Sequence, residues 1–151
     1  MDVCFSGTFN ILHKGHKHLI DKAIELAGKK GNVYIGVTDG EMLKNKEFTI
    51  PVNEKINKIK EYLKSKNYDK QTIIKIIYDE FGPAVEGNYD SIVVSPETIK
   101  NAEELNKKRK DSGKKPLQII KIPHVLADDN KPISSTRIYK KEIDEEGRIL
   151  K

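Results

Sequence analysis

Residues 2–38 read DVCFSGTFNILHKGHKHLIDKAIELAGKKGNVYIGVT, and this stretch contains a complete strand–helix–strand pattern. Its first part, Asp2–Ser6, is short and mostly apolar, which predicts a buried strand. From Lys14 to Ala27 apolar residues recur every three or four positions, which predicts an amphipathic helix. Asn32–Thr38 is a second apolar run and predicts another buried strand. This order predicts two parallel strands joined by a right-handed crossover.

The rest of the chain repeats the alternation. Further strands are expected at Thr72–Tyr78, Asp90–Val94 and Leu117–Ile122, and further helices from Val52, over Thr98–Lys110, and from about Ser134 to Ile143. The pattern predicts an α/β fold: a single doubly wound, Rossmann-like domain over residues 1–151 with a five-stranded parallel sheet. Ligands of such sheets lie beyond the carboxyl ends of the strands, so we expect the functional site there.

Composition narrows the classes of protein that this chain can belong to. Of its 151 residues 34% are charged and 36% are hydrophobic, which is typical of a globular protein with a solvated surface. The net charge of +5 is spread among acidic residues and comes with only three arginines, so we expect no nucleic-acid partner. The chain has no apolar run long enough to predict a membrane span. A single cysteine, Cys4, and a first segment unlike a secretion signal favour the cytoplasm.

The segment after the first strand is the first candidate for chemistry. It reads Gly7-Thr8-Phe9-Asn10-Ile11-Leu12-His13-Lys14-Gly15-His16. Gly7 permits a sharp turn, and Gly15 lets a phosphate approach the backbone. His13 and His16 are three residues apart at a helix start, where both can face one ligand. The free amides and the dipole of the helix N-terminus favour an anion there.

A second candidate is Ile133-Ser134-Ser135-Thr136-Arg137, near the end of the chain. Three consecutive hydroxyl residues at a helix start can bind an anion through hydroxyls and amides, although capping alone also explains them.

The first candidate segment has an alternative as well, because His13 and His16 with His18 could bind zinc. No Cys, Asp or Glu stands at ligand spacing in that segment, so we expect no metal held by the protein.

Together the two segments resemble the signatures of the nucleotidyltransferases that carry an HxGH motif. The resemblance implies that His16 stabilises the reacting α-phosphate, that His13 contacts nucleotide phosphates, and that the second segment binds the β- and γ-phosphates. The nucleotide-binding residues implied are Gly7, Thr8, Phe9, His13, Gly15, His16, Ser134, Ser135, Thr136 and Arg137. Two positions depart from the family pattern. Asn10 replaces the usual aspartate, and Tyr139 replaces the final arginine of the second signature, whose charge Arg137 or Lys140 could supply.

Within that superfamily the chain is most similar to the phosphopantetheine adenylyltransferases of archaeal and eukaryotic type. Residues 128–132 lack the Arg-Thr-Glu-Gly that typically marks the cytidylyltransferases, which favours ATP over CTP. The resemblance implies two substrates, ATP carrying Mg²⁺ and 4′-phosphopantetheine. It implies catalytic roles for His16, Lys44 and Lys46, and acceptor-binding roles for Thr8, Lys46, Glu97 and Arg109. A cytidylyltransferase, another acceptor, or a nucleotide-binding module without catalysis remain as alternatives.

Overall fold

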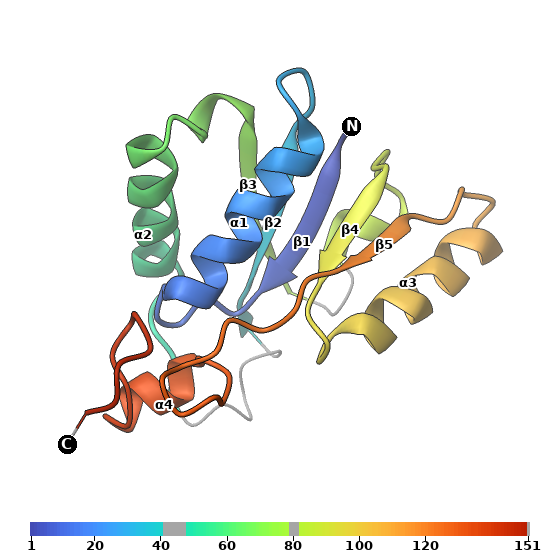
Figure 1. Ribbon diagram of the computed structural model, residues 1–151. Coiled ribbons are helices and arrows are strands. Elements are labelled where there is room, and N and C mark those ends of the chain that lie inside the picture. Colours follow the sequence, from blue (N-terminus) through green and yellow to red (C-terminus); the bar gives the residue numbers. More distant parts are fainter. Residues whose placement is uncertain (41–47, 79–81, 151) are drawn as a thin grey trace.

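A parallel sheet lies at the centre of the computed structural model, which describes residues 1–40, 48–78 and 82–150 (Figure 1). Among these residues the sheet has five strands in the order β3-β2-β1-β4-β5. The strands are β1 (Val3–Gly7), β2 (Val33–Thr38), β3 (Thr72–Ile77), β4 (Ser91–Val94) and β5 (Gln118–Lys121). Every neighbouring pair is parallel, so the predicted doubly wound α/β fold is confirmed.

Helices cover both faces of this sheet. α1 (Lys14–Ala27) and α2 (Val52–Ser65) lie on one face, and α3 (Ile99–Asp111) lies on the other (Figure 1). The reason is that α1 and α2 lead from β1 towards β3, whereas α3 leads from β4 to β5 in the opposite direction, and right-handed crossovers then place them on opposite faces. The short helix α4 (Ser135–Tyr139) lies beyond the carboxyl ends of the strands. Of the helices in the described ranges, none combines the length and apolar composition that a membrane crossing needs.

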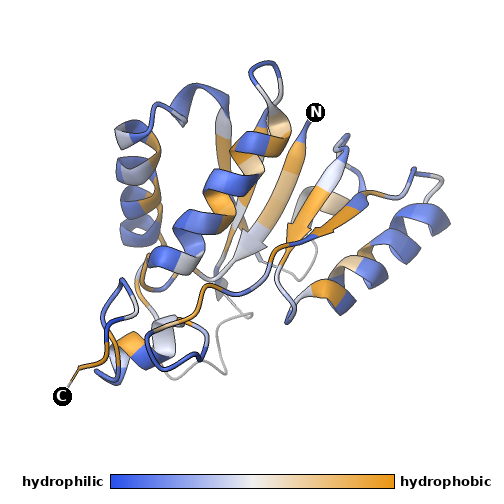
Figure 2. Ribbon diagram, viewed as in Figure 1, coloured by the Kyte–Doolittle hydropathy of each residue, from blue (hydrophilic) through white to orange (hydrophobic). Residues whose placement is uncertain are grey.

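The strands are apolar on both sides because both faces of the sheet are covered. Val3 and Val33 are paired in the β1–β2 register, are fully buried, and pack in the same cluster as Ile20 of α1. Cys4 points to the other face and packs with Leu105 of α3. Figure 2 shows hydrophobic strands beside helices whose outer surfaces are hydrophilic.

The strand order reverses between β1 and β4, which are neighbours in the sheet. At such a switch point the connections after adjacent strands leave in opposite directions and open a crevice at the carboxyl edge. The Gly7–His13 connection begins at this edge, and α4 lies below it (Figure 1). The fold therefore brings the two candidate segments to one end of the sheet.

The last helix is shorter than the sequence predicts. It ends at Tyr139 instead of near Ile143, and Lys141 has a φ of 63°. A residue in the left-handed region cannot continue a right-handed helix. Ile143 is fully buried and packs with Ala127 and Ile133 in a small cluster of its own. The segment after α4 thus folds back beneath the helix.

Arg109 has a structural role in the fold, and the acceptor-binding role predicted for it stays a prediction. Its side chain is only 3% exposed. Nε donates to the carbonyl of Lys115 at 2.9 Å, and Nη1 donates to those of Ala84 at 2.7 Å and Gly87 at 2.8 Å. Because α3 starts at the carboxyl edge of the sheet and runs back, Arg109 in its last turn lies towards the opposite edge. The guanidinium ties α3 to the connection that precedes β4.

Replacing this guanidinium should cost stability. We expect Arg109→Met to lower the free energy of unfolding by about 3 kcal/mol, because buried carbonyls lose their donor. Urea denaturation measures the change. Lys110→Met, on the exposed neighbour, is the matched control and should stay within about 0.5 kcal/mol of the wild type. A loss no larger than that of the control would contradict the structural role.

Candidate active site

The connection from β1 to α1 turns sharply around a buried phenylalanine. Phe9 has a φ of 52° and is 3% exposed. Its ring packs against those of Phe5 and His16, with centroids 6.2 Å and 4.7 Å away. A Cβ at Gly7 would lie 3.0 Å from the Phe9 ring. Glycine is therefore needed at position 7 because the aromatic ring folds back over the backbone.

His13 caps α1 with its side chain. Its Nδ1 accepts from the backbone N–H of Gly15 at 3.0 Å and of His16 at 3.4 Å. Nδ1 of His16 accepts from the backbone N–H of His13 at 3.3 Å, so the two imidazoles form a reciprocal capping box. A Cβ at Gly15 would lie 2.9 Å from Cε1 of His13. The space that a side chain at position 15 would need is thus taken by the capping ring, and the approach of a phosphate to this backbone stays a prediction.

This cap changes how α1 can bind an anion. The N–H groups of Gly15 and His16 are used by His13, and that of Lys14 donates to the carbonyl of Glu145 at 3.0 Å. The free amides predicted at the start of this helix are therefore already paired. An anion beside α1 has to be bound by side chains.

Both imidazoles are neutral at pH 7. Burial lowers the pKa of His13 to about 4. Burial, and then the neighbouring His13, lower the pKa of His16 well below its usual value. The rings stack with centroids 3.8 Å apart. Because Nδ1 of each ring accepts a backbone N–H, the proton of each neutral ring sits on Nε2.

The second predicted segment is bound directly to the first. Ser135 Oγ donates to the carbonyl of Ile11 and accepts from its N–H, both at 3.1 Å. Ser134 caps α4 by accepting the N–H of Arg137 at 3.2 Å. Thr136 is exposed on the first turn of α4. Two segments that are 124 residues apart in the chain therefore form one surface.

Arg137 faces a different set of partners from the one predicted. Its guanidinium forms ion pairs with Asp129 and with Glu142, and Nη1 also donates to the carbonyl of Pro132 at 3.1 Å. A hydrogen bond from Arg137 holds the pKa of the Asp129 carboxyl below its usual value. Two carboxylates neutralise this cation. Within the protein the guanidinium therefore orders the turn around α4, and the nucleotide-binding role of Arg137 stays a prediction.

Sequence reasoning missed the contacts of Asn10, Phe48 and Tyr139. Asn10 Nδ2 donates to the carbonyl of Phe48 at 3.0 Å, and its Oδ1 accepts from the N–H of Ile50 at 3.3 Å. The rings of Phe48 and Tyr139 stack at 4.2 Å with an angle of 7° between their planes. The only sequence signal for these contacts was that Asn10 and Tyr139 depart from the family pattern.

The remaining predicted residues fall into two groups. Thr8 follows β1, and Glu97 follows β4 with its side chain 77% exposed and Oε1 at 3.8 Å from His124 Nε2. Both lie at the carboxyl edge, where the sequence placed them. Lys44 and Lys46 lie outside the described residues, so their roles stay predictions. Among the described residues no cluster of three or more His, Cys, Asp or Glu side chains could hold a metal ion.

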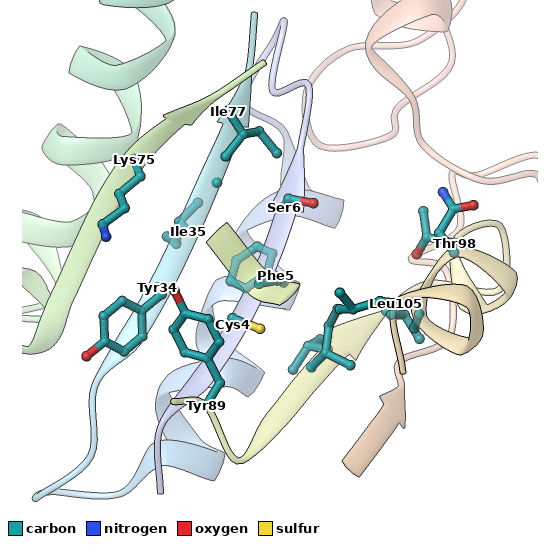
Figure 3. Close-up of a pocket in the computed structure, with 17 residues that line it drawn as sticks. Cys4, Phe5, Ser6, Tyr34, Ile35, Lys75, Ile77, Tyr89, Thr98 and Leu105 are labelled. Atoms are coloured by element: carbon teal, nitrogen blue, oxygen red, sulfur yellow. The ribbon is translucent and has the colours of Figure 1, made fainter. Parts of the chain in front are cut away.

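A pocket opens next to these groups, on the face of the sheet that carries α3. Its empty space is about 730 Å³ when the open mouth is counted. Figure 3 shows Ser6 and Ile77 towards one end, Cys4, Tyr34 and Tyr89 towards the other, and Thr98 and Leu105 along one side. Since Ser6 directly precedes Gly7 and Thr8, the first end lies towards the carboxyl edge of the sheet. The lining is mostly apolar, as in many small-molecule sites.

Comparison with known proteins gives a consistent result. The cytidylyltransferase-like family matches residues 4–141. A phosphopantetheine adenylyltransferase of Methanosarcina mazei is 43% identical over 150 residues, which cover 99% of this chain and 97% of the relative. That of Methanosarcina acetivorans is 45% identical over 97% of this chain and 94% of the relative. The chain belongs to the phosphopantetheine adenylyltransferase family.

The fold has a counterpart among solved structures. A crystal structure of a protein described as of unknown function, from Archaeoglobus fulgidus, has a TM-score of 0.72 and is 35% identical. The match covers 81% of this chain and 89% of that one. The doubly wound sheet is thus shared with a solved structure as well as derived from the crossovers.

The buried His13 should make the stability of the protein depend on pH. In the unfolded chain His13 binds a proton below about pH 6.5, whereas in the folded protein it binds one only below about pH 4. Acidification between these two values therefore favours unfolding. We expect His13 to contribute a loss of about 3 kcal/mol between these two values. Urea denaturation at about pH 7, 5.5 and 4.5 measures it.

His13→Asn is the matched variant for this measurement. Asparagine keeps an N-cap acceptor but does not titrate, so the slope of stability against pH should be shallower than in the wild type. Equal slopes in the two proteins would contradict the assignment of His13 as a buried neutral group.

Proposed function

We propose that the protein transfers the adenylyl group of ATP to 4′-phosphopantetheine, giving dephospho-coenzyme A and pyrophosphate. The observation that carries this proposal is the joining of both signature segments through Ser135 and Ile11. Relatives named phosphopantetheine adenylyltransferase, with 43% and 45% identity over nearly the whole chain, support the choice of acceptor.

We assign the pocket to the arm of the acceptor. 4′-Phosphopantetheine has a phosphate at one end and a flexible arm of two amides that ends in a thiol. With the phosphate near Thr8, the arm enters past Ser6 and runs along the apolar face towards Cys4 and Tyr34. Exposed Glu97 lies near the start of α3, at the carboxyl edge. The predicted acceptor-binding roles of Thr8 and Glu97 are kept on these grounds.

The reaction is an in-line displacement at phosphorus. An oxygen of the acceptor phosphate forms a bond to the α-phosphorus, the bond from that phosphorus to the bridging oxygen breaks, and the electron pair leaves with pyrophosphate. No covalent intermediate with the protein is needed, so positioning and charge stabilisation carry the rate. Mg²⁺ enters with ATP as part of the substrate, held mainly by phosphate oxygens and water.

The neutral imidazoles are suited to this task. Nε2–H of His16 donates to the α-phosphate oxygens as negative charge develops there, and Nε2–H of His13 donates to the neighbouring phosphates. Since the first amides of α1 are occupied by the cap, these side-chain donors take over the role that helix amides often have. Lys44 and Lys46 follow β2 in sequence and are proposed to bridge the acceptor and the α-phosphate.

Turnover should require phosphopantetheine and His16. We expect pyrophosphate release with ATP, Mg²⁺ and 4′-phosphopantetheine, and a fall of about 100-fold or more in kcat for His16→Ala, because a transition-state donor is lost. Nicotinamide mononucleotide, glycerol 3-phosphate and replacement of ATP by CTP serve as the comparisons. Activity with CTP or another acceptor would overturn the substrates, and tight ATP binding without any turnover would indicate a regulatory module.

The pocket yields a separate prediction. Asn101 lies on its rim and is exposed, so Asn101→Trp should place an indole across the opening without disturbing the core. We expect the KM for 4′-phosphopantetheine to rise about tenfold, which corresponds to about 1.4 kcal/mol, with the KM for ATP unchanged.

The control for this variant comes from the same helix. Glu103 is exposed and does not line the pocket, so Glu103→Trp should leave both KM values as they are. An equal effect of the two tryptophans, or a rise in the KM for ATP instead, would show that the acceptor arm does not use this pocket.

A further inference from the structure

Two threonines lie side by side where β1 and β2 end. The register pairs Gly7 with Val37, so the next residues, Thr8 and Thr38, are neighbours at the carboxyl edge. Thr38 is only 6% exposed, and its Oγ1 donates to Oγ1 of Thr8 at 3.3 Å. Thr38 therefore reaches the site through Thr8.

This hydrogen bond decides what Thr8 can do. A threonine hydroxyl has one proton and two lone pairs. When Thr8 accepts from Thr38, its own proton cannot lie along the same line and points away from Thr38. A hydroxyl held in this way is presented to a ligand as a donor, whereas an unheld hydroxyl rotates between donating and accepting.

Thr38 is itself held from behind by a buried cation. Lys55 of α2 is 2% exposed, and its Nζ donates to the carbonyl of Thr38 at 2.9 Å. A buried ammonium is costly unless it is paired, so this contact ties the end of β2 to α2. With its backbone fixed, the β-branched side chain of Thr38 has few rotamers to choose from.

We propose that Thr38 is a positioning residue that fixes the Thr8 hydroxyl as a donor to the acceptor phosphate, with Lys55 bracing Thr38. The assignment rests on the proposed function, because it needs a phosphorylated acceptor beside Thr8. It extends that function to a residue which never touches substrate. Lys55–Thr38–Thr8 forms a chain of contacts from the core between α2 and the sheet to the site.

Thr38→Val tests the proposal, because valine has nearly the same shape and no hydroxyl. We expect the KM for 4′-phosphopantetheine to rise about tenfold. This rise corresponds to about 1.4 kcal/mol, and a hydrogen bond to a charged group contributes about that much or more. The KM for ATP should not change. Thr38→Ser keeps the hydroxyl and should restore the acceptor KM to near the wild-type value.

A double-mutant cycle separates positioning from a structural role. In a Thr8→Val background Thr38→Val should have no further effect on the acceptor KM, because the hydroxyl that it orients is absent. Multiplicative effects of the two substitutions, or equal shifts in the KM for ATP and for the acceptor, would overturn the proposal. So would an unchanged acceptor KM in Thr38→Val.

The same series distinguishes this proposal from the proposed function. Wild-type turnover combined with a silent Thr38→Val overturns only the positioning role. A wild-type protein that is inactive with every phosphorylated acceptor overturns the proposed function and the positioning role with it.

Discussion

The imidazole of His13 on the N-terminus of α1 is the interaction on which the rest of the site depends. It uses the amides of Gly15 and His16, and it requires glycine at position 15 because the ring lies where a side chain would begin. The ring of His16 stacks on the ring of His13. The HxGH spacing is therefore a capping motif first. Its two histidines occupy fixed positions because each ring accepts a backbone N–H at the start of the helix.

The cap also determines the chemical character of the site. A helix N-terminus with free amides attracts anions by its partial charge, but here those amides are paired and the buried rings are neutral. In the proposed reaction the two neutral rings then act as N–H donors to the phosphates. Their alignment does not have to reorganise as charge moves from the acceptor phosphate towards pyrophosphate, and such preorganised donors stabilise a transition state. Positive charge has to come from elsewhere, which is consistent with lysines after β2.

The sequence predicted the sheet, but it did not predict the contacts that the charged residues make within the protein, for one physical reason. Apolar periodicity is local, so the positions of strands and helices could be derived from short windows of sequence. The crossover rule then predicts helices on both faces of the sheet. The partners of a guanidinium are not local. Arg109 donates to carbonyls 22 and 25 residues earlier, and nothing in the segment around it indicates their approach. The end of α4 was missed similarly, because burial of Ile143 against Ala127 and Ile133 decides it.

The two departures from the family signatures look independent in the sequence but meet in the structure. Asn10, in place of the aspartate, holds the backbone of Phe48 and Ile50 by using both a donor and an acceptor, which a carboxylate could not do. Tyr139, in place of the arginine, stacks on the ring of the same Phe48. A change in one signature is thus linked through Phe48 to the change in the other. The segment that precedes α2 is held between them by hydrogen bonds and ring contact, where an aspartate and an arginine would have brought opposite charges.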